Sequence, residues 1–120
     1  MKLLLIDDNP SITTMLSKYL TVKGNHQCTV INDGKEGLAL IKKDNFDVIL
    51  LDLALPKFSG HDLIDSLSDD GTIKDHKIIV LSASPMTDTE ATTLMGKGVL
   101  TCLPKPVQLK KLLETIENII

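Results

Sequence analysis

Short apolar runs alternate with stretches of helical periodicity along this chain. The apolar runs are nearly continuous in Leu, Ile and Val and stop abruptly at polar or charged residues. Runs of this kind are typical of strands that are buried on both faces of a parallel sheet. The sequence therefore predicts five strands, at Lys2–Asp7, Gln27–Ile31, Phe46–Leu51, Ile78–Leu81 and Val99–Leu103.

Each predicted strand is followed by apolar residues at helical spacing, so that five helices alternate with the strands. Pro10 suits the first turn of a helix, where its missing N–H is not needed. Thr87 and Glu90 have the spacing of a capping box. The expected helices run over Asn9–Gly24, over Gly34–Asp44, from Ser59, from Thr87, and over Leu109–Ile120.

This alternation predicts an α/β fold with a doubly wound, five-stranded parallel sheet and five helices. Right-handed crossovers between parallel strands place the helices on both faces of such a sheet. The length of 120 residues is typical of one domain, and no low-complexity linker or internal repeat interrupts it. We therefore expect a single domain over residues 1–120.

Composition narrows the classes of function. The formal net charge is −3, and the aromatic residues are only Tyr19, Phe46 and Phe58. We expect no direct nucleic-acid binding, because such binding relies on cationic contacts to phosphates and on aromatic stacking. We also expect no membrane segment, since the longest apolar runs, Leu3–Ile6 and Val48–Leu51, are far shorter than the about 20 residues that span a bilayer.

Neither the cysteines nor the histidines form a metal-ligand pattern. Cys28 and Cys102 are widely spaced and match no redox motif, so we expect two small buried apolar residues. The chain does not begin with the pattern of a signal peptide, and a reduced, cytoplasmic setting fits best. The histidines share no ligand spacing and are expected at the surface: His26, His61 and His76.

Polar residues that can take part in chemistry stand at the ends of four of the predicted strands. Asp7 and Asp8 follow the first strand, and Asp52 follows the third. Ser82 and Lys105 follow the fourth and the fifth. In an open α/β sheet, functional side chains gather beyond the carboxyl ends of the strands. We therefore expect three carboxylates, one hydroxyl and one ammonium group in a single crevice.

This set of groups suggests phosphoryl chemistry that depends on magnesium. Clustered carboxylates repel one another unless a cation intervenes, and oxygen ligands without His or Cys favour a hard ion such as Mg²⁺. The ion can neutralise a phosphoryl group that approaches Asp52. Lys105 and the Ser82 hydroxyl can contact the other phosphoryl oxygens. Asp52 is then the nucleophile and forms an acyl phosphate.

Each of these residues also has a purely structural interpretation. The Asp7-Asp8 pair could cap the following helix, and Asp52 could belong to an ordinary turn at the end of a strand. Ser82 could be a satisfied hydroxyl and Lys105 a solvated lysine. These readings would leave the common position of the residues at strand ends unexplained.

The chain resembles the receiver domain of two-component response regulators from about residue 2 to its end. The resemblance rests on Asp7-Asp8, on Asp52-Leu53-Ala54-Leu55-Pro56 with Gly60, on Ser82-Ala83, and on Gly98 through Lys105-Pro106. It implies a flavodoxin-like fold with strand order 2-1-3-4-5.

The resemblance also implies the role of each site residue. Asp52 would accept a phosphoryl group from a phosphohistidine on a sensor histidine kinase or phosphotransfer protein. Asp8, Asp52 and the backbone carbonyl of Ala54 would bind Mg²⁺ directly, and Asp7 would bind it through water. Ser82 and Lys105 would contact the phosphoryl oxygens, and the peptide bond between Lys105 and Pro106 is typically cis in the family. Such a domain catalyses only its own phosphorylation and dephosphorylation.

Three further features bear on dephosphorylation and on how the domain would signal. Receiver domains usually carry an aromatic residue or His three positions before the active-site lysine, where this chain has Cys102. The positions that tune dephosphorylation hold the small residues Ala54 and Ser84, so we expect no acceleration of phosphate loss from them. The fourth helix contains four threonines, Thr87, Thr89, Thr92 and Thr93, and is expected to be among the least stable elements.

The expected output is a change in a protein-binding face made by the fourth helix, fifth strand and last helix. It would contact a downstream protein in a chain that is monomeric or a weak homodimer through the same face. We expect a free-standing regulator, although an excised piece of a longer one would read the same. An alternative is an interaction module that works without phosphate, for which Cys102 is the only support. Ala54 argues against an aspartyl-phosphate phosphatase, and Asp7-Asp8 against a flavin carrier.

Overall fold

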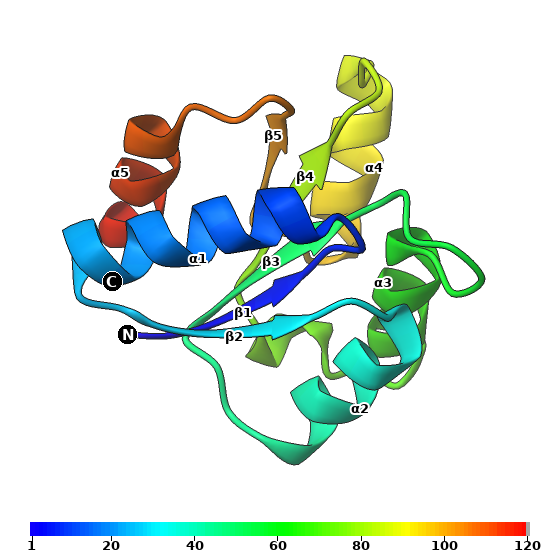
Figure 1. Ribbon diagram of the computed structural model, residues 1–120. Coiled ribbons are helices and arrows are strands. Elements are labelled where there is room, and N and C mark those ends of the chain that lie inside the picture. Colours follow the sequence, from blue (N-terminus) through cyan, green and yellow to red (C-terminus); the bar gives the residue numbers. More distant parts are fainter. Residues whose placement is uncertain (120) are drawn as a thin grey trace.

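The computed structural model describes residues 1–119, and its five strands form one parallel sheet with the order β2-β1-β3-β4-β5 (Figure 1). Every neighbouring pair in this sheet is parallel. The strands are β1 (Lys2–Ile6), β2 (Gln27–Ile31), β3 (Val48–Asp52), β4 (Ile78–Ser82) and β5 (Thr101–Pro104). The expected strand order is confirmed.

Helices connect successive strands and cover both faces of the sheet. They are α1 (Pro10–Gly24), α2 (Gly34–Lys43), α3 (Gly60–Asp69), α4 (Asp88–Lys97) and α5 (Leu109–Ile119), with a short 3₁₀ helix, η1 (Ile73–Asp75), before β4. None of the helices in residues 1–119 is long and apolar enough to cross a membrane.

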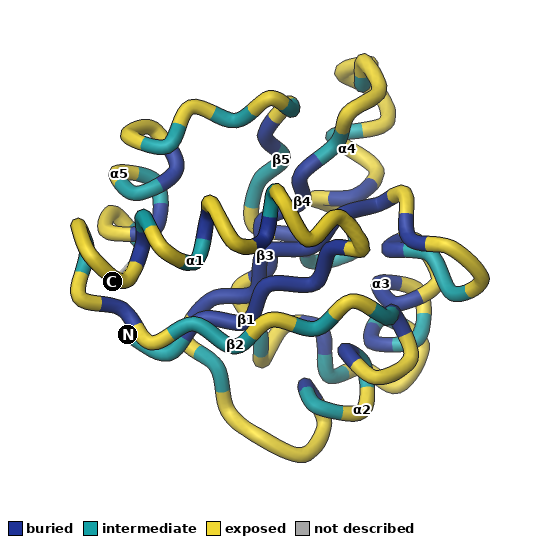
Figure 2. Tube along the Cα trace, viewed as in Figure 1, coloured by how far each residue is buried: buried dark blue, intermediate teal, exposed yellow. Residues whose placement is uncertain are grey.

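The side chains of the strands alternate between two hydrophobic cores. Leu3 and Leu5 of β1 pack with α1 and α5 on one face, and Leu4 and Ile6 pack with α2, α3 and α4 on the other. The buried strands at the centre and the exposed outer faces of the helices are visible in Figure 2. Double coverage explains why the strands of the sheet centre read as continuous apolar runs, and it confirms the doubly wound fold.

Two strands start later than the apolar pattern predicts. β3 begins at Val48 instead of Phe46. β5 begins at Thr101 instead of Val99 because the backbone N–H of Val99 donates to the carbonyl of Leu94 at 3.1 Å and so belongs to the end of α4. Apolar side chains occur on both sides of each boundary, so hydrophobicity alone does not mark where the backbone pairing starts.

The expectation of a surface position was wrong for His26, which is only 6 % exposed. α1 ends at Gly24, and the capping residue Asn25, with a φ of 56°, turns the chain sharply toward β2. The backbone N–H of His26 donates to the carbonyl of Leu20, and its Nδ1 lies 3.3 Å from the amino group of Met1. The tight turn therefore folds the imidazole against the chain start.

The two cysteines are free thiols and are partly exposed instead of buried. Cys28 lies on β2 and Cys102 on β5, which are the two edge strands of the sheet. Edge strands have a neighbour on one side only, and this leaves part of each thiol open to solvent.

Candidate functional site

The three predicted carboxylates meet at the carboxyl ends of β1 and β3. Asp7 directly follows β1 and Asp52 is the last residue of β3; each is 4 % exposed, whereas Asp8 is exposed. One carboxylate oxygen of each residue lies within 4.8 Å of those of the other two. The side-by-side pairing of β1 and β3 produces this cluster from residues that are 45 positions apart, since Ile6 is in register with Leu51.

Lys105 brings a positive charge into this cluster. Its Nζ lies 2.7 Å from Oδ2 of Asp7 and 3.4 Å from Oδ2 of Asp52, and its side chain is 12 % exposed. The backbone N–H of Lys105 donates to the carbonyl of Ser82 at 2.8 Å, which anchors the segment after β5 beside β4. The peptide bond from Lys105 to Pro106 is cis, as expected. The cluster therefore holds three carboxylates and one ammonium group.

Burial and charge act in opposite directions on Asp52. Burial raises the pKa of the Asp52 carboxyl, and the negative charge of Asp7 raises it further. The backbone N–H of Ala54, 3.2 Å from Oδ1, and the Lys105 ammonium lower this pKa, but the balance is a raised pKa. A bound cation would favour the ionised form of Asp52, because it would add positive charge where the carboxylates repel one another.

Asn9, and not the aspartate pair, caps α1. The Asn9 side chain accepts hydrogen bonds from the backbone N–H groups of Ser11 and Ile12. Asp7 accepts from the N–H of Asn9 at 2.9 Å through Oδ1 and leaves Oδ2 to Lys105. Helix capping therefore does not explain the Asp7-Asp8 pair.

Ser82 stands at the same edge of the sheet, but its hydroxyl is turned to its own loop. It donates to the carbonyl of Ser84 at 3.1 Å. Ser82 lines a groove of about 240 Å³ together with Asp52. The structure thus brings Ser82 to the site without a hydrogen bond to the carboxylate.

Gly60 allows α3 to start directly against the end of β3. A Cβ at this position would lie 2.5 Å from the carbonyl oxygen of Asp52 and 2.7 Å from the Cα of Leu53. The backbone N–H of Gly60 donates to the carbonyl of Leu53 at 3.1 Å. A side chain here would push α3 away from the end of β3, which gives a physical reason for a glycine at position 60.

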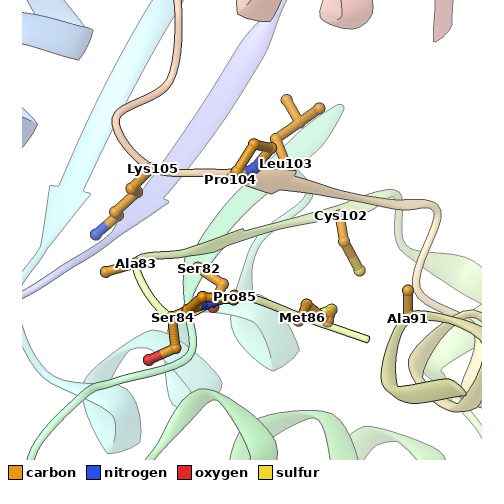
Figure 3. A pocket seen from close by; sticks show the side chains of 10 residues that line it. All are labelled: Ser82, Ala83, Ser84, Pro85, Met86, Ala91, Cys102, Leu103, Pro104 and Lys105. Atoms are coloured by element: carbon orange, nitrogen blue, oxygen red, sulfur yellow. The ribbon is translucent and has the colours of Figure 1, made fainter. Parts of the chain in front are cut away.

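Two recesses flank the loop of residues 82–86. The larger, of about 470 Å³, lies between this loop and β5 (Figure 3). Cys102 points toward Met86 and Ala91 in this recess, whereas Leu103 points to the other side of β5 (Figure 3). Burial raises the pKa of the Cys102 thiol, so its protonated form is favoured. A small, protonated thiol therefore stands in the position where the family usually has a ring.

The smaller recess contains a residue to which sequence reasoning gave no role. His61 is exposed, as expected, yet it lines the groove beside Asp52 together with Glu90 of α4. The position of His61 in the sequence, one residue into α3 after Gly60, contains no signal for this placement. Only the packing of α3 and α4 on the same face of the sheet brings the two side chains to one groove.

The residues at the strand ends fit a hard divalent cation. The donors are carboxylate oxygens, which suit Mg²⁺ and not a softer metal. Asp8, the exposed member of the cluster, leaves the site accessible from solvent. A partly open site is what an ion needs to keep room for waters and phosphoryl oxygens.

Comparison with known proteins agrees with this arrangement. The family model of the response regulator receiver domain matches residues 3–117. The chain is 31% identical over 119 residues to the probable C4-dicarboxylate response regulator DctR of Bacillus subtilis, covering 98% of this chain and 51% of that protein. It is 29% identical over 125 residues to protein PilH of Pseudomonas aeruginosa, covering 99% and 97%.

A solved structure supports the fold in the same way. The receiver domain of a Francisella response regulator, 1452, superposes with a TM-score of 0.88 at 28% identity and covers 98% of this chain and 94% of that one. The chain spans about half the length of the DctR relative and nearly all of PilH.

Proposed function

This chain belongs to the response regulator receiver domain family, and we propose that Asp52 is the residue on which it accepts a phosphoryl group. The donor is a phosphohistidine of a sensor histidine kinase or phosphotransfer protein. The single observation that carries the proposal is the cluster at Asp52: a buried carboxylate with two further carboxylates within 4.8 Å and the Lys105 ammonium 3.4 Å away. The domain is a signalling device and not an enzyme with an external substrate.

In the proposed transfer, an Asp52 oxygen attacks phosphorus and the bond from phosphorus to the donor imidazole nitrogen breaks, which leaves an acyl phosphate on Asp52. Mg²⁺, when bound, neutralises charge on the phosphoryl group. Asp8, Asp52 and the backbone carbonyl of Ala54 hold the ion in this proposal, and Asp7 holds it through water.

Lys105 supplies the second positive charge. Its ammonium lies between Asp7 and Asp52 before transfer, so a short movement exchanges a carboxylate partner for a phosphoryl oxygen. The exchange preserves one charge-assisted contact and adds no unpaired charge to the site.

Ser82 links the acyl phosphate to the rest of the molecule. To contact a phosphoryl oxygen, its hydroxyl has to leave the carbonyl of Ser84, and this releases the loop of residues 82–86. The recess of about 470 Å³ beside this loop provides space for such a movement. We propose that the movement changes a face built by α4, β5 and α5, which a downstream protein reads.

The proposed partners are the phosphodonor and this downstream protein, with the chain as a monomer or a weak homodimer through the same face. The proposal includes neither nucleic acid nor membrane. The exchange would take place in the cytoplasm, because sensor kinases form their phosphohistidine there from ATP.

A phosphate-independent interaction module is the second candidate, and Cys102 is the observation that favours it. Because Cys102 carries a small thiol, the recess at β5 holds no aromatic ring at this position that could move when the Ser82 hydroxyl moves. A module of this kind would bind its partner equally well with Asp52 modified or unmodified.

The two candidates are separated by incubation with acetyl phosphate or beryllofluoride, with and without Mg²⁺. We expect wild type to gain the mass of one phosphoryl group only with Mg²⁺, and Asp52→Asn to gain none. Asp69→Asn, an exposed carboxylate at the end of α3, is the matched control and retains the adduct. No Mg²⁺-dependent adduct on wild type would overturn phosphorylation at Asp52 and favour the second candidate.

A further inference from the structure

The groove that opens beside Asp52 is bounded by small residues where it meets the carboxylate. Ala54, two residues after β3, and Ser84, two residues after β4, line the groove. The groove has a volume of about 240 Å³. Since one water fills about 30 Å³ of liquid, the groove has room for several waters next to the acceptor. Water can therefore reach an acyl phosphate on Asp52 through this groove.

Two further ionisable residues line the same groove. His61 extends from the first turn of α3 and Glu90 from the first turn of α4. Among the described residues that line the groove, only Asp52 itself is also ionisable. Of these three kinds of side chain, imidazole is the one that ordinarily exchanges a proton near neutral pH, and His61 and Glu90 both lie outside the carboxylate cluster.

Backbone hydrogen bonds hold the first turn of α3, which carries His61, in place. Ser59 and Asp62 form a reciprocal capping box at the start of α3, and Gly60 donates to the carbonyl of Leu53. The first turn of α4, which carries Glu90, is capped by Thr87, whose Oγ1 accepts a hydrogen bond from the backbone N–H of Glu90 at 3.1 Å. Both first turns are thus anchored at the groove.

We propose that His61 is a positioning residue for hydrolysis of the acyl phosphate on Asp52, and that it acts through water in this groove. The inference rests on the proposed function. A water attacks phosphorus, and the bond from phosphorus to the Asp52 oxygen breaks. The products are the free carboxylate and inorganic phosphate. The proton lost by the attacking water passes along the groove water to the imidazole of His61 and then to solvent.

The charged groups around the imidazole are compatible with this role. Asp52 from β3 and Glu90 from α4 face the same groove. On α3 itself, Asp62 accepts from the backbone N–H of Ser59, and Asp65 pairs with Lys97 of α4 at 2.8 Å. These two carboxylates have other partners, whereas Glu90 lines the same groove as His61.

The test follows loss of phosphate after wild type and variants are phosphorylated with phosphoramidate and Mg²⁺ and the donor is removed. We expect His61→Gln to form the adduct normally and to lose it about tenfold more slowly, less than the effect of a base in direct contact. The decay rate of His61→Gln should also depend less on pH than that of wild type. Added imidazole should restore decay in His61→Ala more than in His61→Gln.

His76→Gln is the matched control, because His76 lies at the end of η1 and does not line the groove. It should decay at the wild-type rate with the wild-type pH profile. Normal adduct formation in His61→Gln with unchanged decay and an unchanged pH profile would overturn the inference alone. Absence of any Mg²⁺-dependent adduct on wild type would overturn the proposed function as well.

Discussion

Nζ of Lys105 lies 2.7 Å from Oδ2 of Asp7, although 98 residues separate them along the chain. The contact joins the segment after β5 to the end of β1, across the ends of β3 and β4. Both side chains are largely buried, so each group depends on the other for compensation of its charge.

The first prediction concerns this ion pair. Lys105→Met should lower the free energy of unfolding by about 2–4 kcal/mol in the absence of Mg²⁺, because it leaves Asp7 and Asp52 buried without a counter-charge. Urea denaturation at neutral pH measures the change. In the double variant with Asp7→Asn the loss should be smaller, since less buried charge is left unpaired. Strictly additive effects of the two substitutions would show that the pair is not coupled.

A second prediction compares a glycine whose Cβ position is crowded, Gly60, with one whose Cβ position is open, Gly96. Gly60→Ala should lower stability by about 1–3 kcal/mol and reduce the phosphorylation rate, because its Cβ would collide with the backbone of Asp52 and move α3. Gly96→Ala is the control: nothing lies within 4 Å of its Cβ position, and it lies within α4. It should raise stability by about 0.5–1 kcal/mol. Thermal denaturation of both variants measures these changes, and equal effects would contradict the steric argument.

The third prediction is a pH dependence of stability that arises from His26. Burial lowers the pKa of His26, the Met1 amino group lowers it further, and Glu117 acts in the opposite direction. The folded state therefore binds this proton less readily than the unfolded state, whose value is near 6.5. The contribution of neutral His26 is fully present above that value and is lost as the pH falls from it toward the folded pKa.

His26→Phe should remove this part of the pH dependence, which urea denaturation between about pH 7 and 5 measures. The buried Nε2 of His26 has no hydrogen-bond partner in the described part of the chain, so the substitution sacrifices no bond at that atom. His76→Gln should keep the dependence. If His26→Phe retained the wild-type slope, another group would be responsible for it.

The fourth prediction concerns α4. This helix buries only Leu94 among its ten residues, whereas α5 buries Leu112 and Ile116. Its threonines also lower its intrinsic helix propensity. Amide hydrogen exchange should therefore be faster in α4 than in α5, by about a factor of ten for each 1.4 kcal/mol of difference in the free energy of local opening. Equal protection of the two helices would show that α4 does not open locally.

The sequence by itself determined the type and the order of the secondary structure elements. Strands buried on both faces require continuous apolar runs, and helices require apolar residues at helical spacing, so each pattern is visible locally. The strand-end positions of Asp7, Asp8, Asp52, Ser82 and Lys105 followed from the same alternation and the resemblance to the family. For these features, the residues near one another in the chain contain the necessary information.

Only the tertiary structure decided the features that depend on distances between remote side chains. Three features each need two elements to pack in one orientation: the pairing of Lys105 with Asp7, the burial of His26 against the chain start, and the placement of His61 and Glu90 along one groove. The late start of β5 likewise depends on a backbone hydrogen bond of Val99. Hydrophobic patterning records which face of an element is buried, but it contains no information on which polar groups then come within hydrogen-bond distance.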